Sequence, residues 1–218
     1  MRKQAVSMAA AVALCAAGAQ AGVFWQLITF GEHPIGTSLD GMSVGVAQFE
    51  FVSASEPAVT PVIADVPING GTFGATDNIL ARGVPDGVSM LRLSLDEGLV
   101  IDELSFGITT LPFSPAPFTA SIGLVNASGN VFETRDYATN ILVNLANGLP
   151  LLRYGQHAVD LSLAAEPVYA LEFVFTGNAN QWMMDNIGLA GHVVPAPGVA
   201  SLALLGLAAS ARRRRLDL

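Results

Sequence analysis

The chain has 218 residues and a formal net charge of −8 at pH 7, with 18 Asp and Glu against 10 Lys and Arg. This length fits one domain with a substantial core. The acidic balance argues against nucleic-acid binding, because an acidic surface repels phosphate backbones.

The first 21 residues have the pattern of a secretory signal peptide. A positively charged start is followed by a short apolar run and by Ala19-Gln20-Ala21, so cleavage is expected before Gly22. The apolar run is too short for a membrane span, which needs about 20 residues. Cys15 follows Leu14, where a lipoprotein signal would need a small residue. We therefore expect no lipidation, and a mature protein without disulfides or thiolate metal sites.

The region from Gly22 to His192 is predicted to be one β domain. Short apolar segments are separated by Gly and Pro, and no window keeps a helical period over a dozen residues. Asn140–Leu152 is ambiguous and could hold a helical turn. The predicted strands are Val44–Phe51, Met90–Leu95, Val100–Thr109, Ala120–Val125, Val131–Glu133, Ala158–Leu163, Val168–Phe175 and Trp182–Ala190.

The connections between these strands indicate the architecture. Asn126–Asn130 contains the Asn and Gly residues that a tight hairpin requires. Pro57–Gly74 is predicted to be a long loop broken by an edge strand, and Leu111–Phe118 a Pro-rich connector. The expected fold is all-β, an antiparallel two-layer, jelly-roll-like β-sandwich, with a signal helix before it and a short hydrophobic helix after it.

The segment 193–218 differs in character from the domain. Val194-Pro195-Ala196-Pro197 precedes an uncharged stretch, Gly198–Ala211, and then the cluster Arg212-Arg213-Arg214-Arg215. The prolines would end the last strand, the apolar segment would enter a membrane, and the arginines would remain on the cytoplasmic side. Fourteen helical residues extend about 21 Å, short of a hydrocarbon core of about 30 Å. A processed segment therefore fits better than a permanent anchor, which remains the alternative.

This tail resembles the PEP-CTERM sorting signal of Gram-negative bacteria, in which a Val-Pro-Glu-Pro-like motif precedes an apolar helix and an Arg cluster. The resemblance covers Val194–Arg215, and Ala196 stands where the family has Glu. It implies export, recognition by an exosortase-type transpeptidase, and residence in the cell envelope or the extracellular matrix.

The domain is also similar to those found upstream of such tails. Ile28-Thr29-Phe30-Gly31 and the segment Gly45–Phe51 are similar to their opening strands, and Trp182–Ile187 is similar to their closing strand. This resemblance implies a lectin-like or jelly-roll sandwich without an assigned activity.

The sequence offers no clear catalytic constellation. It has no Gly-x-Ser-x-Gly elbow, and the scattered His33, His157 and His192 are interpreted as solvated loop side chains, with His192 in the linker. The pairs Asp96-Glu97 and Asp102-Glu103 flank Gly98 and are interpreted as a charged hairpin tip. We therefore predict no enzyme activity and no catalytic residue. A polysaccharide-active glycoside hydrolase, with carboxylates that meet only in the fold, remains the alternative.

Calcium is the ion that best suits the acidic domain, although no cofactor is required. Its oxygen ligands would come from Glu32 near the first strand and from Asp185 and Asn186 in the last, with Asp77-Asn78 in reserve. The alternative is that Asp185-Asn186 only bends the chain through bonds to its own backbone.

Glycan binding would use an exposed aromatic ring beside a few polar groups. Trp25 and Trp182 have the size for this role, but Trp182 is more often expected in a core. The leading hypothesis is an exported, envelope-sorted structural or interaction module that associates with extracellular polysaccharide. Its expected partners are a sorting enzyme, the membrane through the tail, and polysaccharide, but not nucleic acid.

Overall fold

The computed structural model describes residues 22–52, 60–65, 79–84, 90–112, 118–143, 152–176 and 179–194. The predicted signal peptide and the sorting tail from Pro195 to Arg215 lie outside these ranges, and so does Asp77-Asn78. Within the described ranges, no helix has the length and apolar character needed to cross a membrane.

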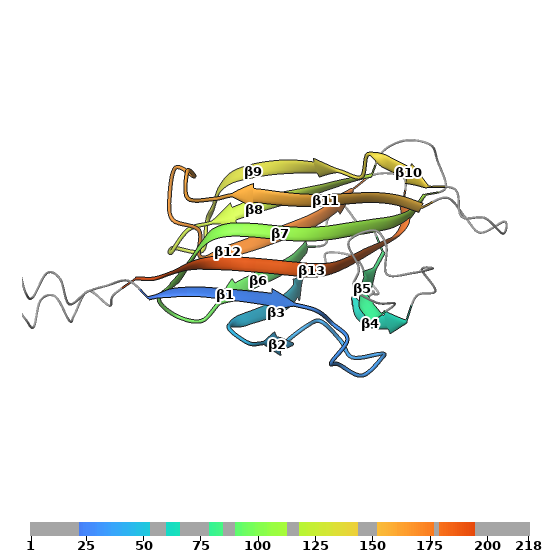
Figure 1. Cartoon of the computed structure of the whole chain (residues 1–218), viewed down its shortest axis with the longest axis horizontal. Coiled ribbons are helices and arrows are strands. Elements are labelled where there is room, and N and C mark those ends of the chain that lie inside the picture. The colour runs from blue at the N-terminus through green and yellow to red at the C-terminus, as the bar shows by residue number, and fades with distance from the viewer. Residues whose placement is uncertain are drawn as a thin grey trace, which may run out of the picture.

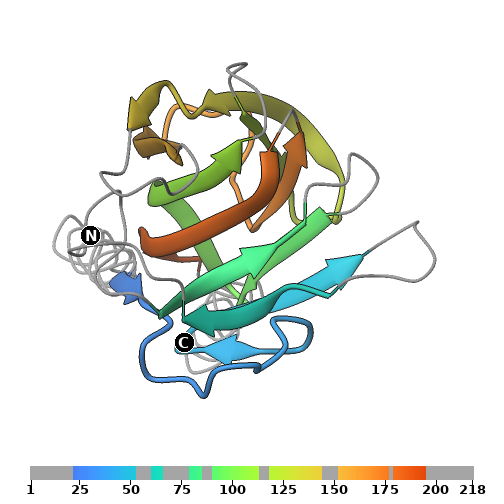
Figure 2. The ribbon, with the colours of Figure 1, turned by 90° about the vertical axis from the view of Figure 1, so that its right-hand side faces the viewer.

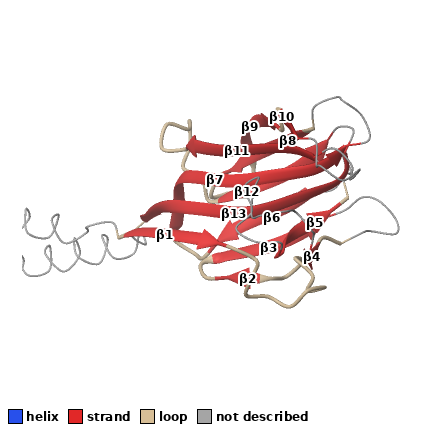
Figure 3. Cartoon of the chain, turned by 45° about the vertical axis from the view of Figure 1, so that its right-hand side comes forward, coloured by secondary structure: helices blue, strands red, loops and turns tan. Residues whose placement is uncertain are grey.

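All regular structure in the described ranges is β-strand (Figure 3). The strands are β1 (Val23–Ile28), β2 (Ser43–Val44), β3 (Ala47–Val52), β4 (Val62–Asp65), β5 (Ile79–Gly83), β6 (Met90–Leu95), β7 (Leu99–Pro112), β8 (Thr119–Val125), β9 (Val131–Ala138), β10 (Ile141–Val143), β11 (Leu152–Asp160), β12 (Ala170–Thr176) and β13 (Ala179–Val193).

The strands form two antiparallel sheets that face each other across the core (Figures 1 and 2). A seven-stranded sheet has the order β10-β11-β7-β13-β5-β4, and β1 also pairs with β13. A six-stranded sheet has the order β2-β3-β6-β12-β8-β9. The predicted all-β antiparallel sandwich is therefore confirmed.

The core forms because each strand turns alternate side chains toward the opposite sheet. In β6, Leu91 and Leu93 are buried while Arg92 points outward, as the alternation of Met90–Leu95 predicted. Aromatic rings join the two sheets at the centre, where Phe106 of β7 packs edge-on against Phe173 of β12, with ring centroids 6.0 Å apart.

The first and last described strands lie side by side. Residues of β1 pair with residues 187–192 of β13, and the amide of Val193 donates to the carbonyl of Gly22 at 2.8 Å. The amide of Val194 donates to the carbonyl of Gly98 at 2.7 Å. The described chain therefore begins and ends at the same end of the sandwich (Figure 1).

A glutamine side chain joins the two sheets beside β1. Gln26 donates from Nε2 to the carbonyl of Val44 at 2.7 Å, and its Oε1 accepts from the amide of Val46 at 3.0 Å. Between them, Gly45 has a φ of 59°, and a Cβ at this position would overlap the Gln26 amide. The Gln26 side chain thus satisfies one backbone carbonyl and one backbone amide in the turn between β2 and β3.

The predicted hairpin is confirmed as β8 and β9. Asn126 Oδ1 accepts hydrogen bonds from the amides of Ser128 and Asn130, and Gly129 has a φ of 79°. Pro57–Gly74 contains β4, which forms an edge of the seven-stranded sheet as predicted. The described start of the ambiguous segment Asn140–Leu152 is strand β10.

Two local predictions are wrong. The turn at Gly98 is not a hairpin tip, because β6 belongs to the six-stranded sheet and β7 to the seven-stranded sheet, so the chain crosses between layers there. The strand expected at Ala158–Leu163 ends at Asp160, because the Asp160 carboxylate bonds to the amide and hydroxyl of Ser162 and turns the chain.

Candidate functional site

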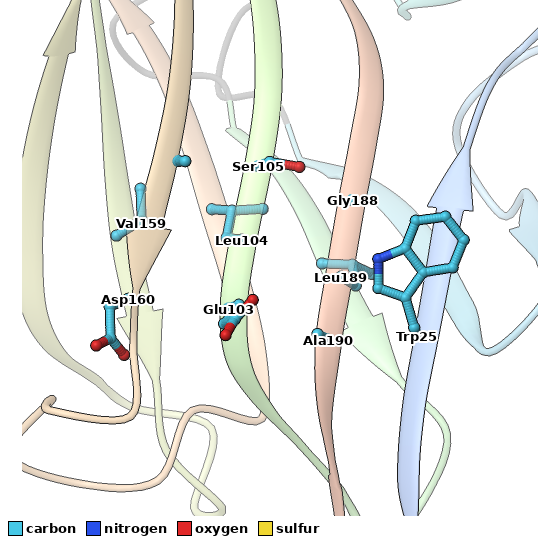
Figure 4. A pocket seen from close by; sticks show the side chains of 10 residues that line it. Trp25, Glu103, Leu104, Ser105, Val159, Asp160, Gly188, Leu189 and Ala190 are labelled. Atoms are coloured by element: carbon cyan, nitrogen blue, oxygen red, sulfur yellow. The ribbon is translucent and has the colours of Figure 1, made fainter.

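The outer face of the seven-stranded sheet carries an open trough near the end where β13 leaves the domain (Figure 4). Its volume is about 350 Å³, within the range of ligand pockets in proteins. Four neighbouring strands, β1, β13, β7 and β11, supply its lining. The lining residues are Trp25, Glu103, Leu104, Ser105, Ala158, Val159, Asp160, Gly188, Leu189 and Ala190.

The pairing register explains why these residues meet. Direct cross-strand partners point to the same face of a sheet, and adjacent strands lie about 4.8 Å apart. The first row across the four strands is Trp25, Ala190, Glu103 and Asp160. The second row is Leu27, Gly188, Ser105 and Ala158.

Small residues form the floor of the trough. A Cβ at position 188 would overlap the Ser105 hydroxyl, so only glycine fits opposite Ser105 without a shift. Because Gly188 and Ala190 have little or no side chain, β13 projects less from the sheet than the larger side chains of β1 and β7 on either side of it. Figure 4 shows the Trp25 indole on one side of them and Glu103 on the other.

Trp25 forms the apolar wall of the trough. Its side chain is 71% exposed, which is unusual for the largest apolar side chain. Tryptophan has a broad apolar face and one N–H donor, a combination enriched where proteins bind ligands. The exposed ring is therefore accessible to a ligand that enters the trough from solvent.

Trp182, the second aromatic candidate, lies in the core as the alternative interpretation expected. It is 2% exposed and stacks on Phe175, with ring centroids 4.0 Å apart and planes 13° apart. Its indole therefore offers no free face to a glycan.

Two carboxylates form the opposite side of the trough. Glu103 and Asp160 are direct cross-strand partners, and both are exposed. The Asp160 carboxylate accepts hydrogen bonds from the Ser162 hydroxyl at 2.6 Å and the Ser162 amide at 2.9 Å. These bonds lower the pKa of Asp160, so this group remains ionised into acidic solution.

The pairing of Glu103 with Asp160 is not evident from the sequence. Asp102 and Glu103 are adjacent in β7 and point to opposite sides of the strand, as their alternation predicts. Asp102 Oδ2 lies 2.7 Å from Nδ1 of His192, whereas Glu103 lines the trough with Asp160. The partner of Glu103 is therefore 57 positions away along the chain and is set by the register of β7 and β11.

The interpretation of the histidines as solvated loop residues is wrong for two of them. His192 lies in β13 rather than in the linker, because the last strand continues to Val193. His157 lies in β11 and packs between Phe106 and Tyr137, with centroid distances of 5.2 Å and 5.1 Å. Burial among these rings lowers the pKa of His157. His33 does lie in a turn, where its amide donates to the carbonyl of Phe30.

The proposed calcium ligands occupy different environments. Asp185 is 2% exposed within β13, whereas Glu32 is exposed in the turn after β1. Asn186 has a φ of 54°, and the pairing of β13 with β7 shifts between Asp185 and Gly188. A β-bulge of this kind re-aims the strand and returns Ile187 to the core. Among the described residues, no group of three or more His, Cys, Asp or Glu side chains is placed to hold a metal ion.

Asp160 lacks the raised pKa that the general acid of glycoside hydrolysis requires. A general acid needs a raised pKa so that it carries a proton near neutral pH. The pKa of Asp160 is instead lowered, and both carboxylates face solvent. The arrangement is suited to accepting hydrogen bonds and attracting positive charge.

Comparisons with known proteins give distant structural neighbours. No family model and no curated protein matches the chain. A cleaved adhesin domain of Lys-gingipain from Porphyromonas gingivalis matches with 13% identity and a TM-score of 0.47, covering 76% of this chain and 97% of that one. A carbohydrate-binding module specific for non-crystalline cellulose matches with 13% identity and a TM-score of 0.45, covering 72% and 99%. A family 29 carbohydrate-binding module matches with 7% identity and a TM-score of 0.37, covering 78% and 92%.

Proposed function

We propose that this protein is an exported, non-catalytic module that binds a polysaccharide chain in the trough between Trp25 and Asp160. The observation that carries the proposal is the exposed Trp25 ring beside a floor of small residues. The apolar face of a sugar ring packs against an aromatic ring, and its hydroxyls donate to carboxylates such as Glu103.

The dimensions of the trough suit a chain that lies across the strands. The row from Trp25 to Asp160 spans three strand spacings, about 14 Å at 4.8 Å each. Because the trough is open, a polymer can enter from its side and continue beyond both ends. An internal segment of a long polysaccharide could therefore bind there.

The first test is the loss of binding in Trp25→Ala. The purified protein is titrated with soluble polysaccharides, including the polymer extracted from its own host, and affinity is followed by calorimetry. Loss of an aromatic anchor should weaken binding about 10- to 30-fold. Because Trp25 is mostly exposed, the free energy of unfolding should change by less than about 0.5 kcal/mol.

Two controls make this result specific. Trp25→Phe keeps an aromatic face and should retain most of the affinity, and Leu163→Ala removes an 83% exposed side chain that does not line the trough. Wild-type affinity in Trp25→Ala would rule out this binding site. Release of new reducing ends by the wild-type protein would instead support the glycoside hydrolase alternative, with Glu103 and Asp160 as its carboxylates.

We further propose that the tail sorts the protein to the cell envelope through an exosortase-type enzyme. The support is the order of Val194-Pro195-Ala196-Pro197, the uncharged stretch and the Arg cluster. Intact mass spectrometry of the protein from its host should give a chain that starts at Gly22 and lacks Arg212–Arg215. A mass that retains these arginines would mean an uncleaved membrane anchor and would contradict sorting.

A further inference from the structure

We propose that the trough selects polysaccharides that carry free, positively charged amino groups over neutral or uronate-containing ones. This inference rests on the proposed function, because it names the class of sugar that the same site prefers. It follows from the placement of Glu103 and Asp160 at one end of the trough, with Trp25 at the other.

The two carboxylates come from neighbouring positions on adjacent strands. Glu103 and Asp160 are direct cross-strand partners, and like charges in such positions destabilise a sheet. Asp160 is held in position by its two bonds to Ser162. Figure 4 shows both side chains on neighbouring strands beside the trough. A cation bound between β7 and β11 would lie near both groups.

No residue that lines the trough carries a positive charge that could pair with the two carboxylates. The lining contains no Lys, Arg or His. The guanidinium of Arg135 approaches Asp160 from β9, but its Nη1 donates to the backbone carbonyl of Asp160 at 3.2 Å. Its Nε is paired with Glu133 at 2.7 Å. Arg135 thus pairs with Glu133, and its positive charge also contributes to the lowered pKa of Asp160. The charged groups that line the trough itself, Glu103 and Asp160, are both acids.

An ammonium group on a sugar matches this site chemically. It has three N–H donors and can reach more than one carboxylate oxygen, and its bonds to a carboxylate are stronger than those of a neutral hydroxyl. An N-acetylated amine has lost this charge, and a uronate would be repelled. Glu103 lies two strand spacings from Trp25, about 10 Å, so one sugar can stack on the indole while the amine of another reaches the acids.

The test compares two oligosaccharides of equal length, a glucosamine hexamer and an N-acetylglucosamine hexamer, binding to the intact protein at mildly acidic pH. The amines of the glucosamine hexamer are protonated under this condition. The glucosamine hexamer should bind about 10-fold more tightly, and added salt should reduce this preference because charges at an exposed site are screened. Polygalacturonate should not compete.

Two variants test whether the preference for the glucosamine hexamer arises in the trough. Glu103→Gln keeps the size of the side chain and should remove most of the preference, because it should weaken binding of the glucosamine hexamer much more than binding of the acetylated hexamer. Glu97→Gln removes one negative charge at an exposed turn that does not line the trough, and should keep the preference. An equal loss in both variants would show that overall charge attracts the amine, which would overturn the inference.

The outcomes also separate this inference from the proposed function. Equal affinities for the two hexamers, both lost in Trp25→Ala, would refute amine selection and leave glycan binding at the trough intact. Failure to bind either hexamer or any tested polysaccharide would refute both.

Discussion

Replacing Trp182 with alanine should lower the free energy of unfolding by about 3–5 kcal/mol, the usual cost of removing a large aromatic side chain from a core. The indole is 2% exposed and stacks on Phe175 of the opposite sheet at 4.0 Å. It also covers Gly83 of β5, where a Cβ would overlap the indole ring. Its loss would therefore leave a cavity at the contact between the two sheets.

Chemical denaturation measures this effect. Unfolding is followed by circular dichroism rather than by fluorescence, because Trp182→Ala also removes a fluorescent side chain. Trp25→Ala is the matched control, because the same substitution at a 71% exposed position leaves the core intact. The two variants should thus have opposite phenotypes, with stability lost at position 182 and ligand binding lost at position 25. An unfolding midpoint of Trp182→Ala equal to that of the wild type would contradict the packing described for Phe175.

Gly191→Ala is expected to have a comparable effect on stability through the backbone. The pairing of β13 with β7 shifts between Ala190 and Gly191, and a Cβ at Gly191 would overlap the backbone carbonyl oxygen of Val100. It would also lie 2.8 Å from Cε1 of Phe24 in β1. One methyl group would therefore push β13 away from both neighbours. The cost should be about 3 kcal/mol or more, at the upper end for overpacking, because backbone atoms cannot rotate away.

Gly22→Ala provides the matched glycine control. Its added Cβ would lie 3.4 Å from Cγ2 of Val193, an ordinary contact, so its unfolding midpoint should stay close to that of the wild type. Hydrogen exchange would localise the damage in Gly191→Ala to the amides of β1 and the end of β13. Wild-type stability in Gly191→Ala would show that β7 and β13 are not held this closely.

The sequence contained enough information for the fold class and for several strands. Alternation predicts the inward side of β6, and the Asn and Gly residues of Asn126–Asn130 predict the hairpin, because both are local properties. The crossing at Gly98 could not be predicted locally, since the same turn residues can join strands within one sheet or between two sheets. The bulge at Asp185-Asn186 is similarly decided by pairing with β7.

Only part of the candidate site could be predicted. The residue type alone marks Trp25 as a candidate for glycan contact, but its exposure depends on which face of β1 meets the core. Glu103 and Asp160 could not be paired without the register of two strands far apart in sequence. One signal was present in the closing strand, where Gly188 and Ala190 alternate with the larger Ile187 and Leu189. A strand that is bulky on one side and small on the other predicts a hollowed outer face.

The position of the trough along β13 determines how the molecule would carry tension. The proposed ligand site and the point where the proposed sorting tail begins lie on the same strand, because Gly188 and Ala190 form the floor of the trough and β13 ends at Val193. The distance along the strand from Ala190 to Val194 is about 13 Å at 3.3 Å per residue. If the proposed sorting attaches this end of the chain to the envelope, a pull from a bound polysaccharide would pass through these few residues, which are hydrogen-bonded to both β1 and β7. The load would act parallel to the strand, as shear on these hydrogen bonds, and would bypass the hydrophobic core.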